Sequence, residues 1–325
     1  MSVTQADLRD DRGRTMWNNL FDFSAYANGF GNSGFGLAQK SGLDLRPTIP
    51  DSSPTLLGVD LTHRIDVSEI AGGAAAKGGP GGGGGGGGGG TTSTFDPYVA
   101  GAVGGYNIKI EFKGSWTQEY VDIFKGAANF LTGFIAQDIP DVYVRAKGAL
   151  TLVDDILITA ELGNIDGAGG VLGQAGPTSI RTASYLPATA SMKFDIADAD
   201  VFKGQGLFDD IVVHEMSHSL GFGSIWGYKN LVAGGLYKGA EALAQYQATA
   251  AGAGATGIPV EQDGGSGTAG SHWDEETFVN ELMTGYIDAD NYVSPMTVAA
   301  FRDLGYGLVG TNYAQYADAG NLLLG

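Results

Sequence analysis

Two histidines and a glutamate lie together in one short segment of this chain. His214, Glu215 and His218 form the pattern His-Glu-x-x-His. On a helix, residues four apart lie one turn apart on the same face, so both imidazoles can bind one zinc ion. Glu215 would then serve as the general base that activates a water molecule. A catalytic zinc site needs three protein ligands and one open position, so the pattern also requires a third ligand elsewhere.

The residues around this pattern predict a buried helix. The preceding apolar residues, 211–213, suit a helix inside a domain. Asp209 and Asp210 suit its first turn, where acidic groups meet the positive end of the helix dipole. Gly221 suits its end, because glycine readily adopts the left-handed conformation that turns the chain away.

The third ligand is not where the shortest zinc-peptidase pattern would place it. In the metzincin peptidases a third histidine follows the second by six positions, and that position here is Ser224. The next histidine is His272, which is followed by several carboxylates. His272 is the candidate that we favour for the third ligand. A glutamate ligand, for instance Glu276 or Glu281, is the alternative and would indicate a gluzincin-type peptidase.

The segment around His272 resembles the leishmanolysin-like metzincins, in particular their bacterial members. That family interrupts the metzincin pattern with a long insertion and resumes at a His-Trp pair, which is His272-Trp273 here. An Asn-Glu-Leu-Met run follows in both, and Met283 matches the methionine that forms the turn beneath the zinc. By this resemblance we expect His272→Ala to weaken zinc binding strongly, whereas Glu281→Gln should not.

The resemblance covers roughly residues 150–310. It matches a core strand at 155–158, an edge strand with its lead-in loop at 166–177, a strand at 191–195 and a closing helix at 294–306. It implies an α+β fold of the metzincin type, with a twisted mixed sheet, two long helices above it, and a mostly irregular or helical C-terminal subdomain. Cysteine is absent, so the disulfides and cysteine-switch propeptide of the better-known eukaryotic members are not expected.

The resemblance also implies where substrate would bind. An extended peptide would pair with the edge strand through backbone hydrogen bonds, which tolerate many sequences. The residues predicted for this contact are Gly170, Val171, Leu172, Gly173, Gln174 and Ala175. Many metzincins place a tyrosine two residues after the methionine, where this chain has Gly285. Tyr286 is therefore a weak candidate, and packing beside the methionine turn is the role that we favour for it.

The remaining sequence reads as alternating strands and helices. Residues 107–112 alternate like a strand, and apolar residues recur at helical spacing over 116–135. Further strands are expected near 142–146, 151–162 and 191–195, and a helix over 239–251. Ser294 and Pro295 suit the N-cap and first position of the last helix, and Gly305 suits its end.

A glycine run gives the clearest domain boundary. We expect a weakly structured N-terminal segment over 1–77, a glycine-rich linker over 78–94 and a catalytic domain over 95–325. Within that domain we expect an upper subdomain at 95–223, an insertion at 224–271 and a lower subdomain at 272–325.

Charge and hydropathy limit the partners. The formal net charge of −18 disfavours nucleic acid, because phosphate binding needs clustered positive charge. No apolar run is long enough for a transmembrane helix, and the first twenty residues show no apolar signal-peptide core. The location stays open between signal-peptide-independent export and the cytoplasm.

Calcium is a further possible ligand. Two acidic groups could bind it, Asp195/Asp198/Asp200 and Asp288/Asp290/Asn291. The second group lacks the glycine and the closing glutamate of an EF-hand loop, and we favour solvated acidic loops for both.

The sequence thus predicts a zinc-dependent endopeptidase acting on protein or peptide substrates, with Glu215 as the general base. A non-catalytic surface or adhesion module that keeps the metzincin shell is the alternative from another class. The intact His214, Glu215 and His218 set argues against it, since a binding module has no need of Glu215.

Overall fold

The structure is a computed structural model that describes residues 15–16, 95–146, 149–165, 167, 172–263 and 268–316. The predicted N-terminal segment, apart from residues 15–16, and the glycine-rich linker lie outside the described residues. The elements, in chain order, are β1 (Thr15–Met16), β2 (Tyr98–Ala100), β3 (Ile108–Gly114), α2 (Gln118–Phe134), β4 (Ile135–Gln137), β5 (Val142–Ala146), β6 (Ala149–Val153), β7 (Ile156–Gly163), β8 (Gly173–Ile180), β9 (Pro187–Asp195), α3 (Ile196–Gly204), α4 (Phe208–Ser219), β10 (Val232–Ala233), β11 (Leu236–Tyr237), α5 (Ala240–Gln247), β12 (Ile258–Pro259), α6 (Glu275–Phe278), β13 (Tyr286–Ile287), α7 (Pro295–Asp303) and β14 (Gly307–Leu308).

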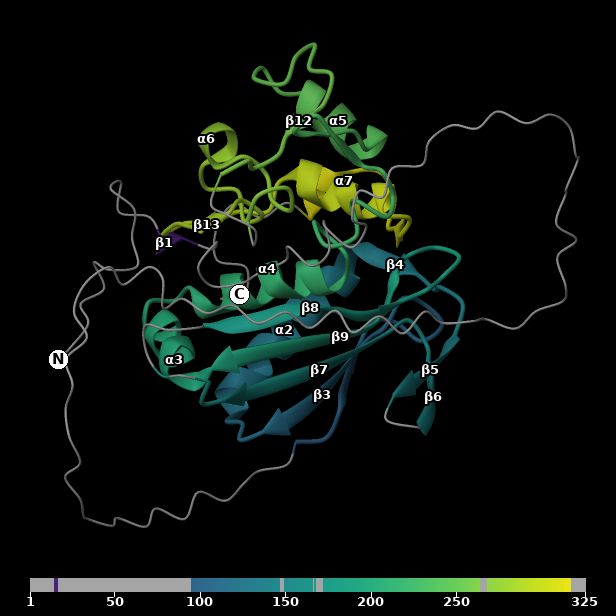
Figure 1. Ribbon diagram of the computed structural model, residues 1–325, viewed down its shortest axis with the longest axis vertical. Helices are drawn as coiled ribbons and strands as arrows, with labels where there is room; N and C mark the ends of the chain where they lie inside the picture. Colours follow the sequence, from purple (N-terminus) through teal and green to yellow (C-terminus); the bar gives the residue numbers. More distant parts are fainter. Residues whose placement is uncertain are drawn as a thin grey trace, which may run out of the picture.

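A twisted mixed sheet forms the base of the molecule (Figure 1). Its five strands lie in the order β2-β3-β7-β9-β8. Strands β3, β7 and β9 run parallel, whereas β2 and β8 pair antiparallel with their neighbours. Side chains of β7 alternate between buried and half-buried, as expected for a central strand with helices on one face. The α+β class with a mixed sheet, predicted from the sequence, is confirmed.

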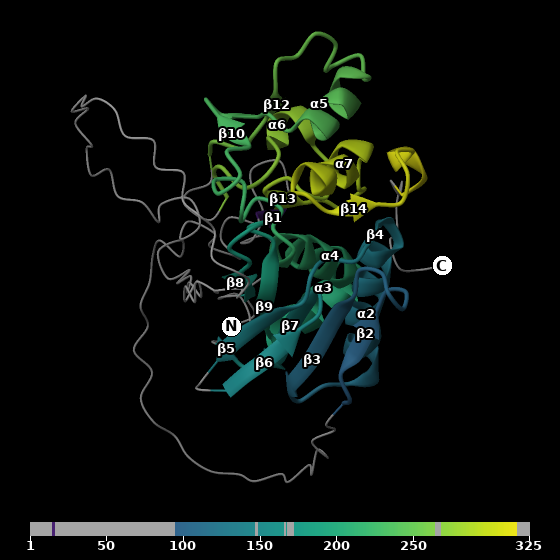
Figure 2. The same ribbon diagram turned by 90° about the vertical axis from the view of Figure 1, so that its right-hand side faces the viewer.

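Helices α2, α3 and α4 pack on one face of the sheet (Figure 2). The predicted helical stripe is confirmed, because α2 buries Tyr120, Phe124, Leu131 and Phe134. Thr117 caps this helix by accepting a hydrogen bond from the amide of Tyr120. Phe124 packs edge-to-face against Phe194 of β9, which fixes the helix on the sheet.

The predicted strand 151–162 is wrong in its extent, since the chain breaks into β6 and β7 at Asp154 and Asp155. Asp155 is buried and accepts amide hydrogen bonds from Asn107 at 2.6 Å and Ile139 at 2.9 Å. Arg181 donates to the backbone carbonyls of Asp154 and Asp155 at 2.7 and 2.6 Å. At Asp154 and Asp155 these contacts take the place of the hydrogen bonds between neighbouring strands. Strand β6 therefore pairs with β5, whereas β7 joins the main sheet.

A second correction concerns the acidic residues at 195–200, for which the sequence favours a solvated loop. They begin the helix α3 instead. Asp195 is buried and caps this helix by accepting from the amide of Ala197 at 2.9 Å, and its other oxygen accepts the amide of Gly167 at 3.0 Å. Asp200 accepts from the Tyr120 hydroxyl at 2.5 Å. Capping and interhelix contacts therefore account for the carboxylates of Asp195 and Asp200.

The chain after α4 forms a second layer above that helix (Figures 1 and 2). It contains α5, α6, α7 and a small sheet of β10, β11 and β12. Strand β14 pairs with β4 at the end of α2, which ties this layer to the base. The predicted helix 239–251 is shorter, at Ala240–Gln247. Ser294 caps α7 with Pro295 at its start, and Gly305 follows its end with φ +99°, as predicted.

Strand β1 pairs antiparallel with β13, so Thr15 lies opposite Ile287 and Met16 opposite Tyr286. This pairing brings one point of the N-terminal segment to the second layer. Among the described helices, none combines the length and apolar composition needed to cross a membrane.

Candidate metal centre

Helix α4 carries the two histidines of the His-Glu-x-x-His pattern, and it is buried along nearly its whole length. Asp209 and Asp210 lie in its first turn, as predicted. At its end, the amides of Gly221 and Phe222 donate to the carbonyls of His218 and Ser217, each at 3.0 Å. This is a Schellman cap, and Gly221 supplies the left-handed residue with φ +109°. The predicted helix end is confirmed.

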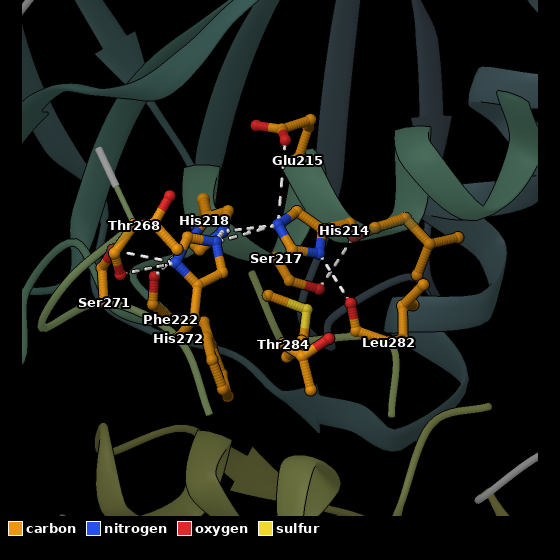
Figure 3. A network of polar contacts seen from close by, with 12 residues as sticks. His214, Glu215, Ser217, His218, Phe222, Thr268, Ser271, His272, Leu282 and Thr284 are labelled. Carbon is orange, nitrogen blue, oxygen red and sulfur yellow. Dashed lines mark hydrogen bonds and ion pairs between the residues drawn. The ribbon is translucent and has the colours of Figure 1, made fainter. Parts of the chain in front are cut away.

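The three predicted histidine ligands converge at one point (Figure 3). The Nε2 atoms of His214 and His218 are 2.9 Å apart, and the Nε2 atom of His272 lies 3.2 Å from the first and 3.0 Å from the second. His214 and His218 are fully buried, and His272 is 1% exposed. The His272 segment therefore comes back to α4 from the far end of the insertion.

Backbone carbonyls hold the opposite nitrogen of each ring. Nδ1 of His214 lies 2.7 Å from the Leu282 carbonyl oxygen, and Nδ1 of His218 lies 2.8 Å from that of Phe222. Nδ1 of His272 lies 3.0 Å from the carbonyl oxygen of Thr268. A carbonyl can only accept a hydrogen bond, so each neutral ring carries its proton on Nδ1.

This tautomer leaves a lone pair on all three Nε2 atoms, and the lone pairs point at one another. Such an arrangement is repulsive by itself and is stabilised by a cation between the rings. Nitrogens bound tetrahedrally to zinc at about 2.0–2.1 Å would lie about 3.3 Å apart, close to the observed separations. Metal-bound histidines also commonly donate their other N–H to a carbonyl. The donor set fits zinc.

Burial keeps the three rings in the neutral form that binds metal. It lowers the pKa of His214 and of His218 well below the ordinary value, and the neighbouring rings add to the shift. Burial lowers the pKa of His272 to about 4, against the opposing hydrogen bond to Thr268. The rings therefore stay unprotonated throughout the neutral pH range.

Glu215 lies beside the histidine cluster (Figure 3). Its Oε1 atom is 3.8 Å from Nε2 of His214, and the side chain is fully buried. Within the described part of the chain neither carboxylate oxygen has a hydrogen-bond partner. Burial raises the pKa of this carboxyl well above its ordinary value. A buried carboxyl with free oxygens is costly, and such groups are typical of active sites.

Two residues that follow α4 have separate structural roles, Gly223 at the His272 segment and Ser224 at the end of the helix. A Cβ atom on Gly223 would collide with the carbonyl oxygen of Ser271, so only glycine allows this close approach. Ser224, which stands where a short metzincin pattern would have its histidine, donates to the carbonyl of His218 at 2.7 Å. The sequence marked this position, but it did not indicate that the hydroxyl would close the end of the helix.

The turn around Met283 connects the ligand segments. Met283 is fully buried, and its carbonyl accepts from the amide of Trp273 at 2.9 Å. The preceding residue, Leu282, provides the carbonyl that holds His214. Tyr286 lies just after this turn, in β13, half-buried and packed against the core.

The alternative glutamate ligands lie elsewhere. Glu276 is exposed on α6, and the carboxylate of Glu281 accepts hydrogen bonds from Met283, Ser294 and Thr297. In the described residues, the group able to hold a metal at this point consists of the three histidines.

The predicted substrate edge corresponds to β8, an outer strand of the sheet that packs against α4. The strand begins at Gly173 and continues to Ile180, further than the predicted stretch 170–175. Gly170 and Val171 lie outside the described residues, as does the side chain of Gln174. Leu172 is buried just before the strand, and Ala175 is half-buried within it.

The acidic groups considered for calcium do not assemble into cation sites. The carboxylates of Asp195 and Asp200 have the helix and tyrosine contacts described above. Asn291 is buried and donates to Asp210 at 2.9 Å and to the carbonyl of Asp288 at 2.9 Å. In the described residues the clustered carboxylates are instead Asp138, Asp154 and Asp155, two of which are exposed.

Comparison with known proteins points to one family. Residues 169–321 match the family model described as leishmanolysin. A stretch of 112 residues is 34% identical to a leishmanolysin homolog of Crithidia fasciculata. That stretch is 29% of this chain and 16% of the relative, so the chain spans only a small part of the length of that protein. Both matches are to proteins of one kind, and the matched region of the family model includes all three converging histidines.

Proposed function

The chain is leishmanolysin-like over residues 169–321, and from this we propose that it is a zinc-dependent endopeptidase of the metzincin type. One observation carries the proposal, namely the convergence of the Nε2 atoms of His214, His218 and His272 beside the Glu215 carboxyl, whose oxygens accept no hydrogen bond from the described residues. Three neutral nitrogens and a nearby acid or base are what a zinc hydrolase needs.

His214, His218 and His272 would hold the zinc, which when bound lowers the pKa of water and polarises a peptide carbonyl. Glu215 would accept a proton from the attacking water at its Oε1 or Oε2 atom, since both are available. The same carboxyl would then donate this proton to the nitrogen of the leaving amine. The buried surroundings strengthen these electrostatic interactions, because little water competes for them.

Substrate would lie extended along β8. The strand is an edge of the main sheet, and its inner partner is β9. Backbone groups on its outer side can pair with a peptide by strand addition, a mode that recognises the main chain. Pro177 lies within β8, and proline is tolerated there because an edge strand need not donate at every position. We propose residues 170–175 as the part of this edge that contacts substrate.

The direct test combines metal analysis with proteolysis. Purified full chain should contain about one zinc per molecule and should cleave an unfolded protein such as casein. Chelation should abolish cleavage, and added zinc should restore it. A zinc-free chain without peptidase activity would support the adhesion-module alternative. Cleavage with a glutamate on the metal would support the gluzincin alternative.

A further inference from the structure

A buried carboxylate, Glu281, lies between the metal centre and the start of α7. Its side chain has no exposed surface. In the described part of the chain, no ion pair with lysine or arginine offsets its charge. Burial raises its pKa, whereas its hydrogen bonds lower the pKa. Burying a carboxylate in this way is costly unless it is fully hydrogen-bonded.

Four donors satisfy this carboxylate. Oε2 accepts from the amide of Met283 at 2.6 Å. Oε1 accepts from the amide of Ser294 at 2.9 Å, from the Ser294 hydroxyl at 2.8 Å, and from the Thr297 hydroxyl. All four groups donate, and an ionised carboxylate can accept them all because it has about four lone-pair sites on its two oxygens. The N-terminus of α7 also favours a negative charge at this point.

Through the turn at Met283 the Glu281 carboxylate is connected to His214, the first proposed ligand. The hydrogen bond from the Met283 amide closes a tight turn that includes Leu282. The Leu282 carbonyl oxygen, inside this turn, accepts the proton of His214 Nδ1 at 2.7 Å. Rotation of the turn would move the carbonyl and change the orientation of the ring.

Through Thr297 the carboxylate reaches the third ligand. The Thr297 hydroxyl donates to Glu281 and accepts from the indole nitrogen of Trp273 at 2.8 Å. Trp273 is fully buried and follows His272 directly. Its amide also donates to the carbonyl of Met283, so the turn and the His272 segment are joined twice.

We propose that Glu281 is a positioning residue of the metal centre, which fixes His214 through Leu282 and His272 through Thr297 and Trp273. This inference rests on the metal-binding part of the proposed function. It revises the expectation from the sequence that Glu281→Gln would not weaken zinc binding strongly. Groups that orient metal ligands typically contribute a factor of about 10–100 to metal affinity.

The test is Glu281→Gln in the full chain, with zinc affinity measured by competition with a chelator. A glutamine keeps the size, but its NH₂ group must face either the Met283 amide or the donors from Ser294 and Thr297. We expect zinc affinity to fall about 10–100-fold. We also expect the visible absorption of the cobalt-substituted protein to change, because the ligand geometry changes.

Asp303→Asn is the matched control. Asp303 is another carboxylate that accepts amide hydrogen bonds, from Glu241 at 2.9 Å and Ala242 at 3.0 Å, but it joins α5 to α7 and touches no histidine. The Asp303→Asn variant should lower the melting temperature of the metal-free protein without changing zinc affinity or the cobalt spectrum. An equal effect of both variants on zinc affinity would reduce Glu281 to a general structural role and overturn the proposal.

A second pair of variants covers the case in which Glu281→Gln does not fold. Thr297→Val removes the hydroxyl that joins Glu281 to Trp273, and Thr297→Ser retains it. We expect zinc affinity to fall in the first and to return toward the wild-type value in the second. Wild-type affinity and an unchanged cobalt spectrum in Thr297→Val, or in a folded Glu281→Gln, would overturn the proposal.

These experiments distinguish a failure of the Glu281 proposal from a failure of the peptidase proposal. A wild-type chain that binds zinc but cleaves no peptide would refute the peptidase, while the affinity ratios would still decide the role of Glu281. A wild-type chain that binds no zinc would overturn both.

Discussion

The Nδ1 atom of His214 lies 2.7 Å from the carbonyl oxygen of Leu282, although the two residues are 68 positions apart. The first ligand on α4 is therefore oriented by the turn that follows the third ligand in the chain. Because His218 is held by Phe222, at the end of the same helix, the three rings depend on both layers of the molecule. The centre can form only when the second layer is folded against α4.

Removing the carboxyl of Glu215 should separate chemistry from metal binding. Glu215→Ala should retain zinc but lower peptidase turnover by about three or more orders of magnitude, since proton transfer in the central step is lost. Zinc content and casein cleavage are measured together. Glu276→Ala, an exposed glutamate on α6, is the control and should behave as the wild type. Near-normal cleavage by a zinc-loaded Glu215→Ala protein would refute the mechanism.

The third ligand is tested by His272→Ala. Loss of one of three nitrogens should weaken zinc binding by orders of magnitude, while the metal-free protein stays folded. Ser271→Ala is the neighbouring control and should still bind zinc. It removes a hydroxyl that contacts His272 Nδ1, but the contact of Nδ1 with the Thr268 carbonyl remains. Unchanged zinc affinity in His272→Ala would remove His272 from the ligand set.

The three buried histidines should destabilise the metal-free protein in mild acid. Folding lowers their pKa, so between about pH 6.5 and pH 4 these rings bind more protons in the unfolded chain than in the folded one. Their contribution to the free energy of unfolding should therefore decrease as the pH falls through this range, opposite in sign to that of Glu215, whose pKa folding raises. For His272 alone, the folded pKa of about 4 places the loss between pH 6.5 and pH 4.

Chemical denaturation of chelator-treated protein at several pH values measures this effect. His272→Asn should reduce the pH slope by about one proton relative to the wild type. A pH slope that does not change in this variant would show that His272 is not a neutral buried ring in the metal-free fold.

Gly223→Ala tests the close approach that delivers His272. The added methyl group would meet the carbonyl oxygen of Ser271, and the residue has φ +67°. Gly254→Ala has a similar φ of +78° but open space around it, so it isolates the backbone cost of about 1–2 kcal/mol. We expect Gly223→Ala to lower the free energy of unfolding clearly more than Gly254→Ala, and also to weaken zinc binding. Equal losses would mean that backbone conformation alone requires glycine at 223.

Deletion of residues 1–90 tests the proposed domain boundary. The proposed ligands and Glu215 all follow this segment, so the shortened chain should fold and bind zinc. The pairing of Thr15–Met16 with Tyr286–Ile287 is only two residues long, so its loss should lower the melting temperature only slightly. Failure to fold or to bind zinc would make the N-terminal part integral to the domain. A gain in activity would instead indicate an inhibitory role for it.

The sequence indicated the three histidines that converge in the structure, because metal chemistry needs particular residue types. His214 and His218 are linked by helical spacing, and few histidines compete for the third place, so His272 could be named. The helix end at Gly221 was also predictable, since only a left-handed residue closes a Schellman cap. Both predictions depended on local patterns, namely the helical spacing of the histidines and the glycine at the helix end.

Features that depend on distant contacts were missed. The break at Asp155 arises from amides of Asn107 and Ile139, which no local pattern connects to it. Helix α3 was hidden because Asp195 reads as a loop residue until its capping role is seen. Glu281 was considered only as a ligand, since the sequence does not show that Ser294 and Thr297 fold back onto it.

The complete burial of His214 and His218 also has a kinetic meaning. An ion held by buried rings from both layers can keep one position open to water and substrate, but it can leave its three nitrogens only when the layers separate briefly. The lifetime of the bound ion would then follow the rate of that opening, and incoming chelator would have little influence on it. Stiffening the contact between α4 and the turn at Met283 would slow metal exchange in both directions, even where the equilibrium affinity stays the same.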